Sequence, residues 1–199
     1  MDIQEIISLV TKTQGLIKNR EMAAHVEEKG LADYVTQVDI AVQNFLKKEL
    51  FALAPDVQFL GEETGLQEIK AARFGILDPV DGTTNLMHNY QHSVVSLALC
   101  CQGEIVMGVI YDPFREEVFS AVKGKGSFLN GQSIYVSNAE KLSDTMIGLG
   151  TAKRELADEN FARFRRVFGQ CQDVRRIGSA ALNWPIPPAA DRTDISRYI

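Results

Sequence analysis

The spacing of hydrophobic residues changes near Pro55, and this change limits the folds that the chain can adopt. Before that point, apolar residues recur at intervals of three and four, which is typical of amphipathic helices. The pattern predicts one helix over about residues 2–28 and a second over 38–53, which Pro55 ends. After Pro55 the apolar runs are short and rich in β-branched residues, which is typical of strands. The sequence therefore predicts helices combined with a sheet.

The short apolar runs of the middle region predict antiparallel strands joined by tight turns. Gly103 and residues 112–114 suit two of the turns, and the glycines of 123–134 suit a further hairpin. Strands are expected at 57–60, 73–77, 93–101, 104–112, 116–122 and 145–150, and a last amphipathic helix at 155–168. Two helices, a strand meander and a strand–helix unit indicate α and β layers that pack together.

The composition argues against several classes of function. The 199 residues carry a net charge of −5 with dispersed basic residues, so no nucleic-acid partner is expected. No apolar run approaches the roughly 20 residues of a membrane span, and the N-terminus lacks the basic start of a secretory signal. Cys100, Cys101 and Cys171 lack metal-ligand spacing, which is typical of reduced thiols in a cytoplasmic protein. His88 and His92 fall in an expected loop and are not assigned to a metal.

Two aspartates close the predicted strand at 73–77, in the segment "DPVDGTTN". A turn at Pro79 can bring Asp78 and Asp81 together, and two close carboxylates repel unless a cation lies between them. Oxygen ligands suit magnesium, and the backbone N–H groups and hydroxyls of "GTTN" suit an anion. The same aspartates would also suit a turn that caps the next helix, so the segment alone leaves both interpretations open.

Two further acidic segments add to this one. Glu62 and Glu63 follow the strand expected at 57–60, although alone they would suit a solvated turn. Asp39 stands at the head of the second predicted helix, where a plain N-cap is the simplest role. In the order "VTxxD", "GEE", "DPxDGTTN", the three segments indicate phosphate ester hydrolysis, because a dication lowers the pKa of water and neutralises phosphoryl charge.

With these segments in this order, the chain resembles the inositol monophosphatase family of magnesium-dependent, lithium-sensitive phosphatases. The resemblance runs from the first helix to about Asn183 and includes "GEET", "DPVDGTTNLMHN" and "RRIGSAALN" (175–183). It implies a mixed α/β fold, the layered α-β-α-β-α sandwich of sugar and inositol phosphatases. A first subdomain is expected over 1–142 and an incomplete second one over 143–199. The resemblance also implies a homodimer for the full-length family.

The resemblance assigns roles to residues of this sequence. Glu62, Asp78 and the Val80 carbonyl would bind one Mg2+, and Asp78 and Asp81 a second. Glu62 and Thr83 would position the attacking water, with Asp39 orienting the Thr83 hydroxyl. Residues expected to bind the phosphate or shape the substrate pocket are Gly82, Thr83, Ser179 and Ala180. The reaction implied is in-line attack by a metal-activated water on a small phosphorylated substrate, inositol 1-phosphate, without a covalent intermediate.

Two departures from the family pattern keep other functions open. The family's "WDxAAG"-type motif, whose aspartate completes the second metal site, has no counterpart here, and Asp191 and Asp194 do not replace it. Pro185, Pro187 and Pro188 interrupt a family helix, either as a real loop or as an out-of-frame reading of the gene. The alternatives are a non-catalytic remnant that binds metal, phosphate or a partner, and a related phosphatase acting on fructose-1,6-bisphosphate or a nucleotide 3'-phosphate.

Overall fold

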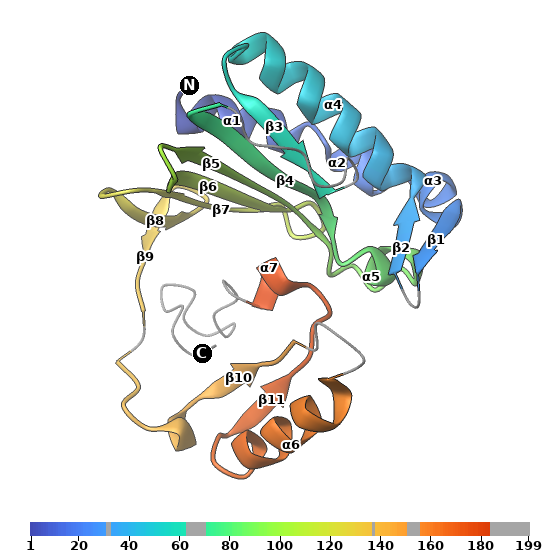
Figure 1. Ribbon diagram of the computed structural model, residues 1–199. Coiled ribbons are helices and arrows are strands. Elements are labelled where there is room, and N and C mark those ends of the chain that lie inside the picture. The colour runs from blue at the N-terminus through green and yellow to red at the C-terminus, as the bar shows by residue number, and fades with distance from the viewer. Residues whose placement is uncertain (31–32, 63–70, 137, 151–155, 184–199) are drawn as a thin grey trace. The chain divides into compact units, whose positions relative to one another are not determined.

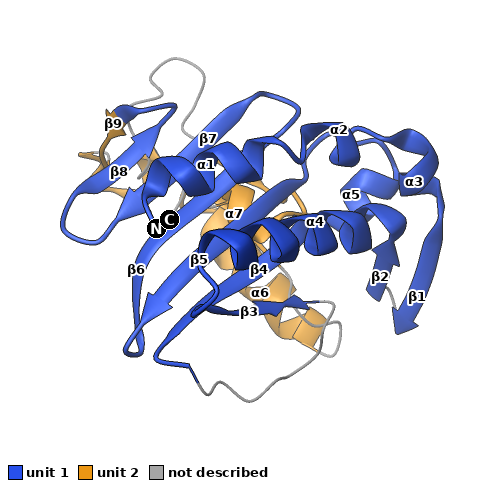
Figure 2. Cartoon of the chain, turned by 90° about the horizontal axis from the view of Figure 1, so that it is seen from above, with its two compact units in different colours: residues 1–132 blue, residues 133–199 orange. Residues whose placement is uncertain are grey.

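The computed structural model describes residues 1–30, 33–62, 71–136, 138–150 and 156–183 (Figure 1). Glu63, the prolines at 185–188, Asp191 and Asp194 lie outside the described residues, so the expectations about them stay untested. The chain divides into two compact units, residues 1–132 and 133–199 (Figure 2). The subdomain boundary expected after residue 142 stays a prediction.

A seven-stranded sheet forms the centre of the first unit, in the order β3-β4-β5-β6-β7-β8-β9. Its strands are β3 (Gln58–Gly61), β4 (Arg73–Asp81), β5 (Val94–Cys101), β6 (Glu104–Asp112), β7 (Glu117–Val122), β8 (Gly126–Leu129) and β9 (Gln132–Ile134). From β4 to β8 each strand pairs antiparallel with the next along the chain, so the predicted meander is confirmed. β3 and β4 instead pair in parallel, so the antiparallel prediction is wrong for the strand expected at 57–60.

Helices cover one face of this sheet (Figures 1 and 2). Helix α4 (Gln37–Leu53) packs on β4, α1 (Ile3–Thr11) packs on β6 and β7, and α2 (Gln14–Ile17) packs on α4. Their buried apolar side chains are Ile6, Val10, Ile17, Val38, Val42, Leu46 and Leu50. As predicted, α4 ends before Pro55. Burial of this apolar stripe fixes the helix whose first turn carries Asp39.

The prediction of one continuous helix over residues 2–28 is wrong. The segment forms α1, α2, α3 (Arg20–Ala24) and β1 (Val26–Gly30), and β1 pairs with β2 (Asp33–Thr36) in a hairpin. The buried Thr13 donates its hydroxyl to the Val10 carbonyl (2.6 Å), and Asn19 accepts from the N–H of Met22 (3.0 Å). Such side-chain bonds compete with the helical ladder and restart it, which apolar spacing alone does not reveal.

The second unit holds a small β–α–β arrangement. Strands β10 (Met146–Gly148) and β11 (Asp173–Arg175) pair in parallel, and α6 (Ala157–Phe168) connects them. A 3-10 helix (Leu142–Asp144) precedes β10, and α7 (Ala180–Asn183) follows β11. The predicted strand at 145–150 and helix at 155–168 are confirmed, and with them the mixed α/β fold class. Among the described residues, no helix is both long and apolar enough to cross a membrane.

Candidate active site

Glu62 and Asp78 are neighbours because β3 and β4 run parallel. Gly61 is paired with Leu77, so Glu62 and Asp78 are the next residues at the same edge of the sheet. A Cβ at Gly61 would come within 1.9 Å of Oε1 of the buried Gln43, so any larger residue at the last position of β3 would require Gln43 to move. The glycine of "GEE" thus lets the end of β3, which carries Glu62, lie close to α4.

An irregularity in β4 brings Asp81 to the same place. Asp78 is paired with Ser96 and Asp81 with Val94, so two residues of β4 lie opposite one residue of β5. One extra residue in a strand reverses the alternation of side chains, so residues three apart can share a face. This bulge explains how the two aspartates of "DPVD" act on a common point.

Asp78 is the electrostatic centre of the site. Burial, and then repulsion from Glu62 and Asp81, raises the pKa of Asp78 from 3.8 to about 8. A hydrogen bond with Glu62 adds to this rise, and the Val80 N–H, which donates to Asp78 Oδ1 at 3.1 Å, opposes it. A buried carboxyl beside two further carboxylates forms the kind of donor set that a hard dication neutralises.

The donor chemistry therefore fits magnesium, although the side chains are not arranged around an ion. Within the described part of the chain, no three His, Cys, Asp or Glu side chains are grouped so as to hold a metal ion. The Val80 carbonyl accepts from the Thr83 hydroxyl at 3.1 Å, and its part in metal binding stays a prediction.

Asp39, in the first turn of α4, is hydrogen-bonded to Thr83. Asp39 is 2% exposed, and its Oδ2 accepts from the Thr36 N–H (2.8 Å) and hydroxyl (2.5 Å) in a capping box. Its other oxygen, Oδ1, accepts from the Thr83 hydroxyl at 3.0 Å. Burial raises the pKa of Asp39, and the bonds from Thr36 and Thr83 oppose that rise. Asp39 thus caps α4 with one oxygen and holds Thr83 with the other.

Gly82 starts the turn that carries Thr83. Its backbone is left-handed (φ 99°, ψ 41°), a conformation that glycine adopts without strain, and α5 (Thr83–Met87) follows at once. The buried Ser93 donates its hydroxyl to the Gly82 carbonyl at 2.8 Å. At the other end of α5, Arg20 donates to the Leu86 and Met87 carbonyls at 2.6 and 3.2 Å. Both ends of the segment 82–87 are therefore held by residues that the sequence did not single out.

Ser179 and Ala180 belong to the second unit and are described within it. Ser179 is fully buried, and its Oγ accepts from the Leu182 N–H at 3.1 Å, which caps α7. Ala180 is exposed at the start of that helix. Their part in substrate binding stays a prediction, whereas their local role as the start of α7 is clear.

The chain is similar to known proteins over most of its length. A model of the "Inositol monophosphatase family" matches residues 3–186. An inositol-1-monophosphatase of Rhizobium meliloti (strain 1021) is 41% identical over 79% of the chain, and a Nus factor SuhB of Xylella fastidiosa (strain Temecula1 / ATCC 700964) is 38% identical over 83%. The chain spans 60% of the length of each of these two relatives.

Two solved structures share the fold. The extragenic suppressor protein suhB of Bartonella henselae is 33% identical with a TM-score of 0.84, and the match covers 90% of this chain and 71% of that one. An IMPase/NADP phosphatase complexed with Mg2+ and phosphate is 26% identical with a TM-score of 0.78, over 89% of this chain and 67% of that one.

Proposed function

Because the chain belongs to the inositol monophosphatase family, we propose that its first unit carries the site of a magnesium-dependent phosphomonoesterase whose substrate is inositol 1-phosphate. The observation that carries the proposal is the bond from Thr83 to the buried Asp39, together with the three carboxylates of Glu62, Asp78 and Asp81. The named activity of the Rhizobium relative and the Mg2+ and phosphate of the solved phosphatase support it.

The Thr83 hydroxyl is arranged to orient a water molecule. It lies 3.0 Å from Asp39 Oδ1 and 3.1 Å from the Val80 carbonyl, and it has one proton to donate. The carboxylate is the stronger acceptor, so Asp39 takes that proton and the oxygen lone pairs of Thr83 remain available. A water that donates one hydrogen to Thr83 and another to Glu62 would keep a lone pair of its own free for in-line attack on phosphorus.

The turn at Gly82 is suited to the phosphate. The first N–H groups of a helix have no acceptor within it, so those of Gly82 and Thr83 can donate to phosphoryl oxygens. Gly82 has no side chain to block this approach, and Ser93 holds its carbonyl on the other side of the peptide.

Magnesium would be held by Glu62, Asp78, Asp81 and the Val80 carbonyl. Bound there, it would lower the pKa of a water and neutralise charge on the phosphoryl oxygens and the leaving group. Asp78 is the central ligand, because it interacts with both of the other carboxylates. The family also suggests a homodimer in the cytoplasm, a part of the proposal that sedimentation and cell fractionation can test.

The test is phosphate release from inositol 1-phosphate by the purified chain, with magnesium and with a chelator. We expect release with magnesium only, and slower release from fructose-1,6-bisphosphate and a nucleotide 3'-phosphate. If one of those two esters is the faster substrate, the enzyme class holds and the substrate assignment is wrong. If no ester is hydrolysed although magnesium still stabilises the chain, the site is a binding remnant and the enzyme proposal fails.

A further inference from the structure

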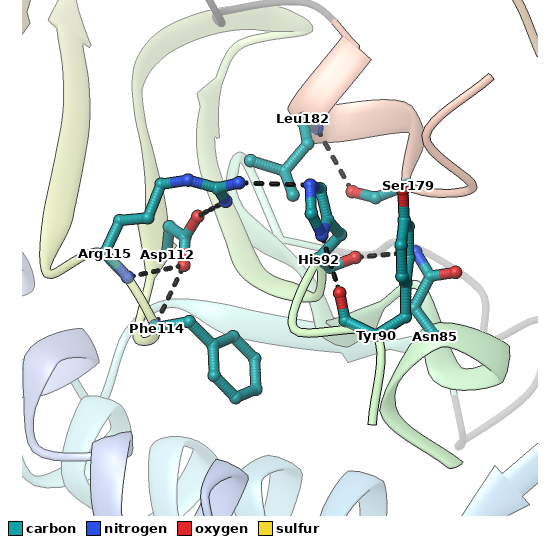
Figure 3. A network of polar contacts seen from close by, with 8 residues as sticks. All are labelled: Asn85, Tyr90, His92, Asp112, Phe114, Arg115, Ser179 and Leu182. Carbon is teal, nitrogen blue, oxygen red and sulfur yellow. Dashed lines mark hydrogen bonds and ion pairs between the residues drawn. The ribbon is translucent and has the colours of Figure 1, made fainter. Parts of the chain in front are cut away.

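A second polar network connects the turn between β6 and β7 to the loop at 88–93, which leads from α5 to β5 (Figure 3). In this loop Asn89 (φ 56°) and Gln91 (φ 49°) have left-handed backbone conformations although neither is glycine. Such residues cost on the order of 1 kcal/mol each and persist when surrounding contacts hold them. The loop is therefore under strain beside the proposed phosphate turn, and its contacts decide its shape.

The buried Asp112 supplies the fixed end of the network. It is fully buried, and its Oδ1 accepts from the N–H groups of Phe114 (2.9 Å) and Arg115 (3.1 Å). Its Oδ2 accepts from Arg115 Nη1 at 2.7 Å. From α2, Gln14 donates to the Pro113 carbonyl (3.1 Å) and to Glu116 (2.8 Å). The turn and the Arg115 guanidinium are thus held before they reach the loop.

Arg115 reaches the loop through His92. Arg115 Nη2 lies 3.0 Å from His92 Nε2, and a guanidinium can only donate, so Nε2 accepts and the ring is neutral. The proton is then on Nδ1, which donates to the Tyr90 carbonyl at 2.6 Å. The imidazole also stacks on the Tyr90 ring, with centroids 4.4 Å apart and planes at 15°. One side chain thereby fixes the backbone on both sides of Gln91.

The loop is in turn joined to the phosphate turn. Asn85 donates its side-chain amide to the His92 carbonyl at 2.7 Å, and Ser93 donates to the Gly82 carbonyl at 2.8 Å. The N–H groups of His88 and Tyr90 donate back to the carbonyls of Thr84 and Asn85. A displacement of His92 would therefore be passed to residues 82–85, which start α5.

We propose that Arg115 is a positioning residue: held by the buried Asp112, it fastens the strained loop 88–93 through His92 and so fixes the turn at 82–85. Its effect on phosphate rests on the proposed function, whereas its effect on the loop does not. The two parts are tested separately.

Hydrogen exchange of the full chain tests the loop without substrate or metal. Arg115→Met removes the donor at similar length, His92→Phe keeps the stacking but loses both ring nitrogens, and His92→Gln places an acceptor near Nε2. We expect the amides of residues 88–90 to exchange about tenfold faster or more in the first two variants, and near the wild-type rate in His92→Gln. Arg73→Met, which breaks an exposed ion pair with Asp56, is the matched charge control and should change nothing in this loop.

Unchanged exchange in Arg115→Met, with α4 amides as protected as in the wild type, would overturn the proposal. So would equal loss of protection in His92→Gln and His92→Phe. If Arg115→Met also speeds amide exchange in α4, the variant is destabilised as a whole. The comparison of His92→Phe with His92→Gln then tests the proposal without it.

Inorganic phosphate with magnesium is the probe for the second part. We expect the dissociation constant of phosphate to rise about tenfold in Arg115→Met, because the N–H groups at 82 and 83 lose their fixed direction. Faster exchange with unchanged phosphate affinity would show that the loop is fastened but positions nothing. If the wild type does not bind phosphate, the proposed function fails, while the exchange result still decides the role of Arg115 in the loop.

Discussion

At the residue scale, Asp78 is the side chain whose replacement separates electrostatic cost from function. In the metal-free chain its charge is opposed by burial, Glu62 and Asp81. Asn is neutral without binding a proton, so we expect Asp78→Asn to raise the free energy of unfolding by about 1–3 kcal/mol near neutral pH, less than the pKa shift alone would give because the site relaxes. The same change should abolish stabilisation by magnesium, which for the wild type is about 2.7 kcal/mol at 100 times the dissociation constant.

The sign of the pH dependence checks the cause of this effect. Because the pKa of Asp78 is raised from 3.8 to about 8 on folding, the folded chain retains a proton that the unfolded chain has lost. The metal-free wild type therefore loses stability as pH rises from about 4 to about 8, and the advantage of Asp78→Asn grows over that window. Chemical denaturation at pH 5, 7 and 9 measures it, with the exposed Asp144→Asn as control. An advantage that does not change with pH, or a wild-type response to magnesium in the variant, would contradict the assignment.

Thr83 offers a second residue-level prediction, because its hydroxyl is assigned to water rather than to phosphate. Loss of the hydroxyl in Thr83→Ala should lower kcat by about 100-fold or more while KM changes by less than about threefold. Thr84→Ala removes a neighbouring exposed hydroxyl and is the control. Steady-state kinetics on inositol 1-phosphate decides: an equal loss in kcat and in substrate affinity would assign Thr83 to phosphate binding instead.

At the scale of the elements, the N-terminus of α4 links stability to the site. The Thr36 hydroxyl accepts from the Val38 N–H (3.2 Å) and donates to Asp39. Thr36→Ala should lower the free energy of unfolding by about 1–2 kcal/mol, and Thr36→Ser, which keeps the hydroxyl, by less than about 0.5 kcal/mol. Urea unfolding measures both. Equal losses would mean that the methyl group, not the cap, stabilises this end of α4.

The same elements show what the sequence could reveal. The strands of the meander follow from short, β-branched apolar runs and turn glycines such as Gly103, whose φ of 80° fits the turn predicted there. These signals are local in sequence, and they were sufficient to predict the strands of the meander. The parallel pairing of β3 with β4 is a contact between whole strands, and no local pattern encodes it. The breaks near Thr13 and Asn19 were missed because apolar spacing does not register side-chain bonds to the backbone.

The residues of the site likewise divide into those that the local sequence reveals and those that it does not. Asp78, Asp81 and Glu62 were found because they follow apolar runs, and Asp39 because it precedes one. Arg20 and Arg115 were missed because their partners lie far away in sequence: Arg20 reaches Leu86, and Arg115 reaches His92. Residues 112–114 were predicted only as a turn, yet an acid at the end of a buried strand was a signal. A carboxylate that is fully buried needs donors, and Asp112 finds them in Phe114 and Arg115.

At the scale of the whole molecule, the two units differ in how much apolar surface they bury. The first unit has a continuous core under α1, α2 and α4. In the described part of the second unit, the buried side chains are Ile134, Thr145, Ile147, Ser179 and Leu182. Its sheet has two strands of three residues each, and α6 buries no side chain and leaves Phe161 65% exposed. Such an arrangement is marginal by itself.

We therefore expect the second unit to open at much lower free energy than the first. In native-state hydrogen exchange, the amides of α6 should open at roughly 0–3 kcal/mol, while those of α4 should approach the free energy of global unfolding. Leu46→Ala in α4 should cost about 2–5 kcal/mol, whereas Phe161→Ser in α6 should cost less than about 0.5 kcal/mol because the ring is already in water. Equal protection of α6 and α4 would contradict this. It would mean that the apolar side of α6 is covered in solution, and sedimentation of the same sample would then show whether a second copy of the chain covers it.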